Sequence, residues 1–403
     1  MTVSIEKSTA SGRVKAPPSK SMAHRYLICG GMSQHSEISG ISFSNDIKAT
    51  VSGLQSLGAE VEICGDIVKI GGIDFSKKPK STVIDCNESG STLRFLIPLC
   101  LLFGTDITLR GSERLFQRSL YVYEQICLAQ GLKFKMSNDS VTVAGRLSNG
   151  IYKVQGDISS QFISGLMFAL SQLEADSRIE IIGNIESASY LALTVKALGK
   201  FGVRISREDE RTIFVKGNQK CKNRVISVEG DYSNAAFLDA FNLFGGNVAV
   251  RGLSKNTAQG DSVYKEHFSA LQSGSPIIDL TDCPDLAPIL MAVAASHNGA
   301  VFTGTKRLKI KESDRGQAMK EELRKFGCYT EIQENRIIVE KTVLKTPDDV
   351  LYGHNDHRIV MALAVLASIT GGTISGAEAV SKSFPDFFEK ISELGIKLRV
   401  VSR

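Results

Sequence analysis

The sequence has no apolar run near the about 18 residues that a membrane-spanning helix needs. Its longest apolar stretches are Phe95–Phe103, Ala287–Ala295 and Ile359–Ile369. The amino-terminal segment MTVSIEKSTASGRVK lacks the apolar core of a secretory signal. The eight cysteines include no CxxC pair, and most lie inside apolar runs, which argues against a zinc site or a disulfide framework. We therefore expect a cytoplasmic enzyme with reduced thiols and no membrane partner.

The sequence also lacks a large excess of basic or acidic residues. The 48 basic and 43 acidic residues leave a net charge of +5, too small for a nucleic-acid partner to be expected from bulk charge. No GxGxxG follows a strand-like segment and no GxxxxGK[ST] occurs, so dinucleotide and P-loop sites lack their phosphate-binding loop. The 403 residues, 42% of them hydrophobic, predict two or three domains with large cores.

What the sequence does contain is a repeat. A helix-like stretch ends at a glycine and runs on into a strand-like segment six times, and these glycines are Gly58, Gly131, Gly202, Gly274, Gly327 and Gly395. A second segment recurs in phase with the first, as a short polar loop that opens an almost wholly apolar helix. Because a helix that is apolar on all faces must be buried, each repeat predicts one buried helix, one surface helix and several strands. We expect six repeats in two sets of three, with a boundary near residues 217–225; a conventional doubly wound α/β sheet is the alternative.

The polar residues of the buried helices gather where those helices begin. They are Lys20, Ser21, Arg25, Gly90, Ser91, Arg94, Ser159, Ser160, Gln161, Asp285, Asp356, His357 and Arg358. A helix amino terminus presents unpaired N–H groups and a partial positive charge, so it favours anions. Further basic residues stand at repeat junctions, namely Arg118, Lys311, Arg315 and Lys382. Because only the ends of such helices reach solvent, we expect these loops to line one interdomain cleft that binds a multiply charged anion.

Metal chemistry is not expected. His354 and His357 are three residues apart, a spacing that suits a metal, but no third ligand clusters with them in the sequence.

Seven motifs occur in order along nearly the whole chain. They are Lys20-Ser21 with Arg25, Gly90-Ser91-Thr92 with Arg94, Ser159-Ser160-Gln161, Glu229-Gly230-Asp231, Lys311-Glu312-Ser313-Asp314-Arg315, Asp356-His357-Arg358 and Ser383-Phe384-Pro385-Asp386. Together they resemble the 5-enolpyruvylshikimate-3-phosphate synthase family, the 3-phosphoshikimate 1-carboxyvinyltransferases. The resemblance implies an α/β (α+β) fold of two similar domains, each of three βαβαββ units with buried helices (an inside-out α/β barrel). It places residues 1–17 with 227–403 in one domain and residues 18–226 in the other.

The implied reaction transfers the enolpyruvyl group of phosphoenolpyruvate to the 5-hydroxyl of 3-phosphoshikimate and releases phosphate, in the shikimate pathway to chorismate. The resemblance implies no cofactor, a monomer, and the herbicide glyphosate as an inhibitor. Residues implied to bind 3-phosphoshikimate are Lys20, Ser21, Arg25, Ser159, Ser160, Gln161, Ser187, Tyr190, Asp285 and Lys311. Residues implied to bind phosphoenolpyruvate are Lys20, Gly90, Arg118, Gln161, Arg315, Arg358 and Lys382. The acid–base candidates are Asp285, Glu312 and Lys20.

Charge agrees with this assignment. Two phosphates and two carboxylates together carry a charge of roughly −5 to −6. The positive charges of the basic residues assigned to the substrates exceed the negative charges of Asp285 and Glu312 by a similar amount, so the two sides nearly balance. Two positions depart from the family pattern, Glu88 in the NESGST loop and Arg307 ahead of the KESDR motif. Both positions bear on substrate affinity more than on reaction type.

Three alternatives remain open at this point. A UDP-N-acetylglucosamine enolpyruvyl transferase would use a loop cysteine as general acid, and the corresponding loop GSERLFQRSL has none. A non-catalytic anion-binding protein of the same fold would be expected to have lost some charged positions. An RNA-end-processing enzyme of related architecture would be expected to show a basic stripe with interleaved aromatic residues.

Overall fold

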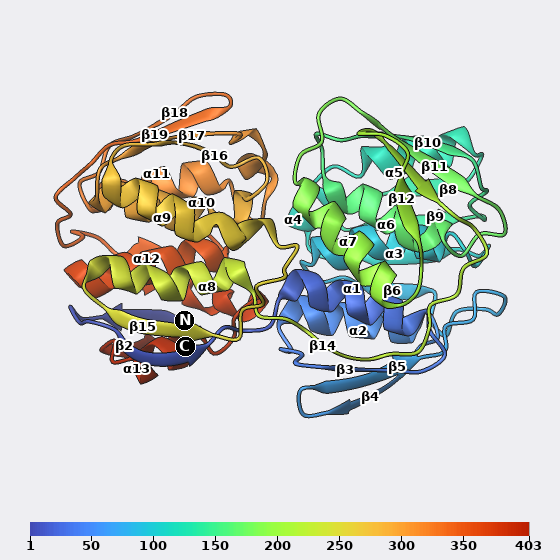
Figure 1. The fold of residues 1–403 in the computed structure, drawn as a ribbon, viewed down its shortest axis with the longest axis horizontal. Helices are drawn as coiled ribbons and strands as arrows, with labels where there is room; N and C mark the ends of the chain where they lie inside the picture. Colours follow the sequence, from blue (N-terminus) through green and yellow to red (C-terminus); the bar gives the residue numbers. More distant parts are fainter. Residues whose placement is uncertain (403) are drawn as a thin grey trace. The chain divides into compact units, whose positions relative to one another are not determined.

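The computed structural model describes residues 1–402, and the chain divides into two compact units. Unit 1 comprises Met1–Pro17 and Gly230–Arg403, and unit 2 comprises Pro18–Glu229. The chain thus begins in unit 1, completes unit 2, and returns to unit 1, as the colours of Figure 1 show.

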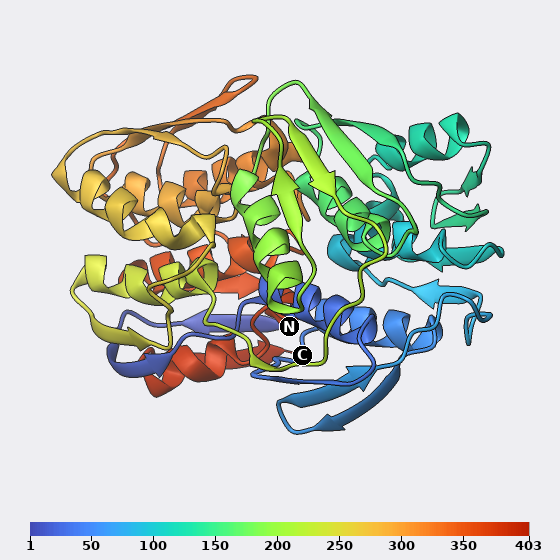
Figure 2. The same cartoon turned by 45° about the vertical axis from the view of Figure 1, so that its right-hand side comes forward.

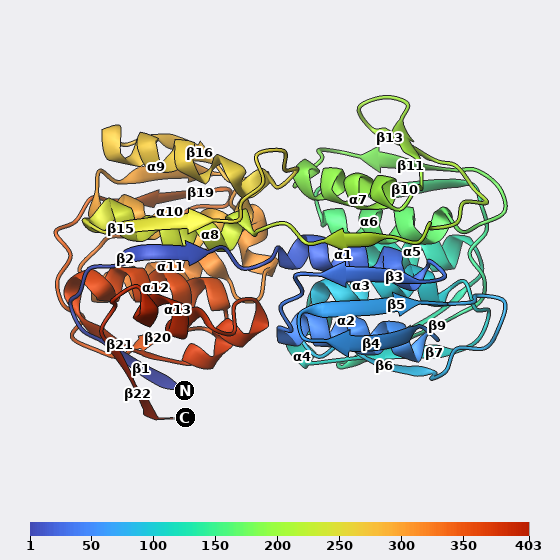
Figure 3. The same ribbon diagram turned by 60° about the horizontal axis from the view of Figure 1, so that its bottom comes forward.

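Unit 2 contains three four-stranded sheets with a common topology. In each sheet the first two strands pair in parallel and the other two pairings are antiparallel. The sheets, in strand order, are β14 (Val225–Ser227), β3 (Ser36–Ser39), β5 (Ile67–Gly71) and β4 (Glu60–Cys64); β6 (Val83–Asp85), β7 (Ile107–Arg110), β9 (Ser140–Ala144) and β8 (Lys133–Met136); and β10 (Ile151–Gln155), β11 (Ser177–Ile182), β13 (Thr212–Val215) and β12 (Ile205–Arg207). Figure 3 shows β3, β5 and β4 side by side on one face of the unit, and Figure 2 shows the β4–β5 hairpin along its edge.

Each sheet of unit 2 is accompanied by one buried helix and one surface helix. The buried helices are α1 (Lys20–Gly31), α3 (Gly90–Cys100) and α6 (Ser160–Leu170). The surface helices are α2 (Asn45–Ser56), α5 (Tyr121–Ala129) and α7 (Ala188–Lys200), and a short helix α4 spans Glu113–Phe116. The surface helices bury one face only, as their amphipathic sequences predict.

Unit 1 repeats this plan with one difference. Two of its sheets have four strands in the same topology, and the third has two parallel strands. In strand order they are β20 (Leu351–Tyr352), β21 (Gly372–Ser375), β1 (Thr2–Ile5) and β22 (Leu398–Ser402); β16 (Ile277–Asp279), β17 (Ala300–Thr303), β19 (Arg336–Val339) and β18 (Thr330–Ile332); and β15 (Asn247–Arg251) with β2 (Ser11–Lys15).

The helices of unit 1 fall into the same two classes. The largely buried ones are α8 (Tyr232–Asp239), α10 (Ala287–Ser296) and α12 (His357–Thr370), and the outer ones are α9 (Tyr264–Ser273), α11 (Arg315–Lys325) and α13 (Phe387–Glu393). Short 3-10 turns are η1 (Ala240–Phe244), η2 (Gly260–Val263), η3 (Pro284–Leu286), η4 (Lys306–Ile310) and η5 (Ala377–Lys382).

The difference lies in the fourth repeat. After each of the other five glycines the strand pairs within the sheet of its own repeat, whereas the strand after Gly274, β16, pairs with β17 and opens the next sheet. Gly274 accordingly has an extended backbone with φ of 176°. The other five post-helix glycines have φ between 65° and 111°, the left-handed conformation that ends a helix.

The six helices predicted to be buried are the six that the structure buries. Their apolar bodies are enclosed, while the first residues of α1, Lys20 and Ser21, are only partly covered. Five of the six begin at a serine or aspartate whose side chain accepts a backbone N–H of the first turn; these are Ser19, Ser89, Ser159, Asp231 and Asp356. The remaining N–H groups of each first turn are available to other acceptors. Within residues 1–402 no helix is both long and apolar enough to cross a membrane.

Candidate active site

The start of α1 places two cations of unit 2. The ammonium of Lys20 lies 2.8 Å from a carboxylate oxygen of Asp46 in the first turn of α2. One turn later Arg25 is 2% exposed, and its guanidinium donates to the hydroxyl of Thr194 and to the carbonyls of Ser21 and Tyr190. Burial lowers the pKa of Arg25 to about 10, because its partners are neutral oxygens that do not balance its charge. An anion supplied from outside would balance it.

Two further guanidinium groups meet at Gly90, the first residue of α3. A Cβ atom added to Gly90 would lie 2.7 Å from Nη1 of Arg118 and 3.0 Å from Nη1 of Arg94. Arg94 also donates to the amide oxygen of Gln161 at 3.0 Å, and Gln161 donates to the hydroxyl of Ser91 at 2.9 Å. The glycine therefore leaves space beside two cations at a helix amino terminus, a setting that suits a small anion.

The remaining predicted residues of unit 2 begin α6 and α7. Ser159 caps α6 by accepting the N–H of Gln161, and Ser160 is the first residue of that helix. Ser187 precedes α7 in the left-handed conformation, with φ of 57°. A serine held in this conformation carries local strain of the kind that gathers at binding sites.

In unit 1 the predicted residues converge on Asp285, at the entry to α10. One oxygen of its carboxylate lies 2.7 Å from Nη1 of Arg315 and 3.4 Å from the ammonium of Lys311, and the other lies 2.9 Å from Nη2 of Arg358. Burial acts to raise the pKa of Asp285, but Arg358, Lys311 and Arg315 outweigh it and hold the pKa well below its usual range. Asp285 is thus an anion that binds three cations.

Arg315 also binds a second carboxylate. Its Nε donates to Asp356 at 2.9 Å, and Asp356 is fully buried as the cap of α12. Ser313 donates to the same oxygen of Asp356 at 3.1 Å. Burial works against the charged form of Asp356, yet Arg315 keeps its pKa below the ordinary value. Asp356, which the sequence placed at the start of a buried helix without assigning it to a substrate, therefore orients Arg315.

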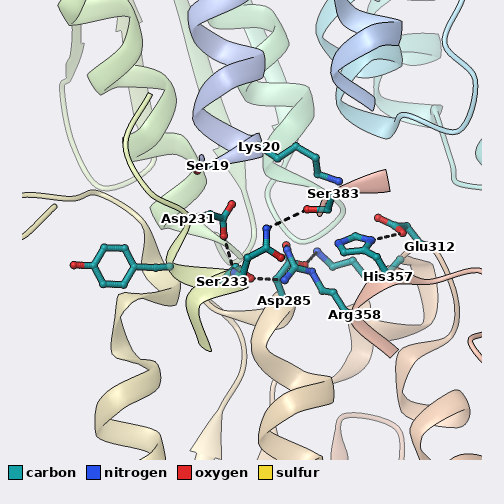
Figure 4. A network of polar contacts seen from close by, with 12 residues as sticks. Ser19, Lys20, Asp231, Ser233, Asp285, Glu312, His357, Arg358 and Ser383 are labelled. Atoms are coloured by element: carbon teal, nitrogen blue, oxygen red, sulfur yellow. Dashed lines mark hydrogen bonds and ion pairs between the residues drawn. The ribbon is translucent and has the colours of Figure 1, made fainter. Parts of the chain in front are cut away.

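Glu312 is turned toward α12. Its carboxylate lies 2.9 Å from Nδ1 of His357, which is 1% exposed, and Figure 4 shows the two side chains directed at one another. His354 instead bonds Glu322 at 3.0 Å, so the two histidines do not form a pair. Among residues 1–402, donor atoms of Glu312, Asp356 and His357 lie within 4.8 Å of one another. A metal ion there would compete with Arg315 for Asp356.

Lys382 completes the predicted set. It is buried at the end of η5 and donates to the carbonyl of Asn355 at 2.6 Å. The structure adds residues that the sequence reasoning did not single out: Asp46 beside Lys20, and Ser233, which accepts a hydrogen bond from Arg358. Arg94, recognised as part of a loop motif, was not assigned to either substrate. Nothing local in the sequence marks Asp46 or Ser233, because their partners are distant in the chain.

The buried carboxylates predict a pH dependence of stability. A carboxyl group whose pKa is lower in the folded chain stabilises it above the unfolded pKa of about 4, and this contribution is lost as the pH falls toward the folded value. We expect Asp356→Asn to lower the free energy of unfolding at neutral pH by about 3 kcal/mol, the lower end for a broken buried ion pair, because Asp285 still faces Arg315. The variant should also flatten the decline in the urea midpoint below about pH 4. Asp348→Asn, at a carboxylate 81% exposed, is the control; an unchanged slope in Asp356→Asn would contradict the assignment.

In each unit cations thus stand at or near the start of a buried helix of an α/β protein built from repeated units, Lys20 and Arg25 in α1 and Arg358 in α12. Such helix starts suit the binding of anionic groups. A family model described as EPSP synthase (3-phosphoshikimate 1-carboxyvinyltransferase) matches residues 5–391. The chain belongs to the EPSP synthase family.

Individual relatives agree. The chain is 39% identical to 3-phosphoshikimate 1-carboxyvinyltransferase of Clostridium kluyveri and 40% identical to that of Clostridium acetobutylicum, covering 98% of this chain and 97% of each relative. A solved EPSP synthase structure from Acinetobacter baumannii superimposes with a TM-score of 0.81 over all of both chains at 22% identity, which shows the common fold. The α/β fold and the family resemblance expected from the sequence are confirmed.

Proposed function

We propose that this protein transfers the 1-carboxyvinyl group of phosphoenolpyruvate to the 5-hydroxyl of 3-phosphoshikimate and releases phosphate. The observation that carries the proposal is the grouping of Lys311, Arg315 and Arg358 around the single carboxylate of Asp285. Three cations around a potential proton acceptor suit a reaction in which an alcohol attacks a molecule with two anionic groups. The relatives named above are described as enzymes of this reaction.

The 3-phosphoshikimate would be held chiefly by unit 2. Arg25 has only neutral hydrogen-bond acceptors, so a phosphate or carboxylate oxygen would supply its missing counter-charge. The N-terminal turns of α1 and α6 offer further N–H donors to the same anion. The proposed contacts are Lys20, Ser21, Arg25, Ser159, Ser160, Gln161, Ser187, Tyr190, Asp285 and Lys311.

Phosphoenolpyruvate would be held chiefly by arginine side chains. Gly90 leaves room beside Arg118 for a phosphate or carboxylate group. Arg315 and Arg358 are held by carboxylates in fixed orientations, which prepares them for bidentate binding of a second anionic group. The proposed contacts are Lys20, Gly90, Arg118, Gln161, Arg315, Arg358 and Lys382. Arg94, which also reaches Gly90, would add to them.

The chemistry is an addition followed by an elimination. In the addition the 5-hydroxyl oxygen bonds to C2 of phosphoenolpyruvate and loses its proton, while the methylene carbon C3 gains a proton. In the elimination C3 loses a proton and the bond from C2 to the phosphate oxygen breaks. Asp285 would accept the hydroxyl proton, Glu312 would exchange the proton at C3, and Lys20 would protonate the departing phosphate.

The low pKa of Asp285 is compatible with this role. Its cationic neighbours make it a weak base as long as they point at it alone. The anionic groups of the substrates would attract Arg315, Arg358 and Lys311 in turn, and nearby negative charge raises the pKa of a carboxyl group. Substrate binding would therefore bring the basicity of Asp285 closer to that needed for proton transfer.

Phosphate release is the direct test. Purified protein should release inorganic phosphate from phosphoenolpyruvate when 3-phosphoshikimate is present, and should not do so with UDP-N-acetylglucosamine. Release with the nucleotide sugar would favour the other enolpyruvyl transferase, and no release with either acceptor would favour a binding protein of this fold.

Substitution of Gly90 tests the placement of phosphoenolpyruvate. The methyl group of Gly90→Ala would lie 2.7 Å from Arg118 and 3.0 Å from Arg94, so at least one guanidinium must move away. We expect the KM for phosphoenolpyruvate to rise about 10-fold, the scale of one charge-assisted hydrogen bond, and inhibition by glyphosate to weaken at least as much. Steady-state kinetics would measure both, with Gly199→Ala, where an added Cβ meets nothing within 4 Å, as the control. Undiminished glyphosate inhibition in Gly90→Ala would refute the placement.

We also propose that the chain acts as a monomer in the cytoplasm. Sedimentation velocity at assay concentration would test the oligomeric state; loss of specific activity on dilution would argue for an oligomer.

A further inference from the structure

The outer helix α11 buries two charged side chains on one face. Arg315, its first residue, is 2% exposed, and Glu322, about two turns later, is 1% exposed. Residues seven positions apart lie on the same side of an α-helix, and both of these side chains bond to the segment that leads into α12. A buried charge is costly unless it is paired and hydrogen-bonded. Arg315 is already assigned to phosphoenolpyruvate, whereas Glu322 lies outside every motif of the sequence and calls for a role of its own.

The carboxylate of Glu322 binds the segment before α12 at two places. One oxygen accepts the backbone N–H of Tyr352 at 2.9 Å, and the other lies 3.0 Å from Nε2 of His354. The ammonium of Lys325 donates to both oxygens, and also to the carbonyl of Val350 at 2.9 Å. Burial acts to raise the pKa of Glu322, but the bonds from His354, Tyr352 and Lys325 outweigh it and lower the pKa. Glu322 is therefore a charged acceptor that ties α11 to this segment.

The segment held in this way contains a strained turn. His354 and Asn355 are consecutive residues with φ of 49° and 52°, the left-handed region that residues other than glycine seldom occupy. Such strain persists only where the surrounding contacts over-determine the conformation, and it gathers at functional sites. The contacts here include the bond between Glu322 and His354 and the bond from the ammonium of Lys382 to the carbonyl of Asn355.

Residues of the candidate site follow the turn directly. Asp356 caps α12 and accepts from Nε of Arg315 at 2.9 Å, and Arg358 donates to Asp285 at 2.9 Å. Helix α11 is thus joined to the chain at the start of α12 twice, by Arg315 within the site and by Glu322 outside it. A site keeps its productive geometry when further contacts hold the elements that carry it.

We propose that Glu322 is a positioning residue for the transferase reaction: it holds the left-handed turn before α12 and thereby orients Arg315 and Arg358, the arginines that receive phosphoenolpyruvate. The inference rests on the function proposed above. Glu322 acts through the turn, because Asp356, the residue after the turn, bonds the guanidinium of Arg315, and Arg358 lies two residues further along. An arginine held in place before the substrate arrives loses less side-chain entropy when it binds an anion.

A positioning role and a purely structural role predict different kinetics. Loss of stability reduces the fraction of folded enzyme, which lowers the apparent kcat and leaves the KM values unchanged. Loss of orientation weakens anion binding in every folded molecule, which raises the KM for phosphoenolpyruvate. The KM for 3-phosphoshikimate should change little, because neither Arg315 nor Arg358 is among its proposed contacts.

The test compares four variants: Glu322→Ala, Glu322→Gln, His354→Ala and the double alanine variant. We expect Glu322→Ala to raise the KM for phosphoenolpyruvate about 10-fold, the lower end for a hydrogen bond involving a charged group, because Asp356 and Asp285 still bind the arginines. Glu322→Gln keeps an oxygen acceptor for the N–H of Tyr352 and should recover part of the affinity. In the Glu322→Ala background the His354→Ala change should add little, because both changes break the same contact.

Glu321→Gln is the matched control. Glu321 is the neighbouring carboxylate of the same helix, is about half exposed, and lies 3.9 Å from His354, beyond hydrogen-bonding distance. The variant should leave both KM values unchanged. Urea midpoints measured for every variant report the loss of stability separately, and if Glu322→Ala folds poorly, Glu322→Gln and His354→Ala carry the same test. The proposal is overturned if the Glu322 variants lower the urea midpoint while the KM for phosphoenolpyruvate stays at the parent value, or if both KM values rise equally.

A second readout does not depend on turnover. Calorimetric titration with phosphoenolpyruvate should show weaker binding to Glu322→Ala than to the parent protein, and unchanged binding to Glu321→Gln. If the parent protein lacks transferase activity but Glu322→Ala still weakens the binding of phosphoenolpyruvate, the proposed function fails and the positioning role stands. If the parent protein is active and Glu322→Ala changes neither this binding nor the KM for phosphoenolpyruvate, the positioning role fails and the proposed function stands. A parent protein with neither activity nor binding would refute both.

Discussion

Replacement of Asp285 with alanine should lower kcat about 100-fold or more, the usual scale for loss of one acid–base group. The variant removes the proposed acceptor of the 5-hydroxyl proton. It also removes the anion that holds Lys311, Arg315 and Arg358 together. Since a negative charge is lost beside three cations, the KM for phosphoenolpyruvate should not rise, whereas the KM for 3-phosphoshikimate should.

Steady-state kinetics with each substrate varied in turn would measure this pattern. Asp279→Asn, six residues earlier at an exposed carboxylate that accepts from Thr281, is the control and should retain activity. Near-normal turnover in Asp285→Ala would show that the carboxylate serves only to balance its cationic neighbours, and the base would then have to be sought elsewhere.

Glu312→Gln should also reduce kcat about 100-fold, while 3-phosphoshikimate still binds. Glutamine can keep the hydrogen bond to Nδ1 of His357 but cannot take up and return the proton at C3. Turnover and calorimetric binding of 3-phosphoshikimate would together separate loss of chemistry from loss of the site.

Glu321→Gln is a matched control for that substitution, because Glu321 also faces a histidine, at 3.9 Å from His354, and is about half exposed. Unchanged turnover in Glu312→Gln would show that Glu312 is a loop carboxylate that orients His357 and takes no part in proton transfer.

The helices that form the interior of each unit could be predicted from composition alone. A stretch such as Ala287–Ser296 has no polar face to present to water, so burial was its only stable outcome. The pairing of strands could not be predicted in the same way. Strand β16 follows Gly274 as a strand follows the other post-helix glycines, yet it pairs with β17. Helix–glycine–strand patterns are local, whereas the choice of sheet depends on partners that local sequence does not specify.

The candidate site residues show the same difference between local signals, which the sequence contains, and distant pairings, which it does not specify. Helix starts bearing Lys20, Gly90 or Arg358 were recognisable, because a polar loop before an apolar helix is a local signal. Their partners were not: Asp46 meets Lys20 across 26 positions, and Ser233 meets Arg358 across 125. Such pairs form only when the chain has folded, so single side chains are easier to predict than the network that orients them.

The path of the chain through unit 1 governs the order in which its strands can pair during synthesis. Strands β1 and β2 are synthesised before unit 2, but their partners β15, β21 and β22 follow only after all of unit 2. At about 5–20 residues per second, β2 waits on the order of 10 s or more for β15. Unit 2 has its whole sequence available during that wait, apart from the stretch still inside the ribosome. Unit 2 therefore has time to fold while the two strands before it are unpaired, and unpaired strands are sites of aggregation that chaperones protect.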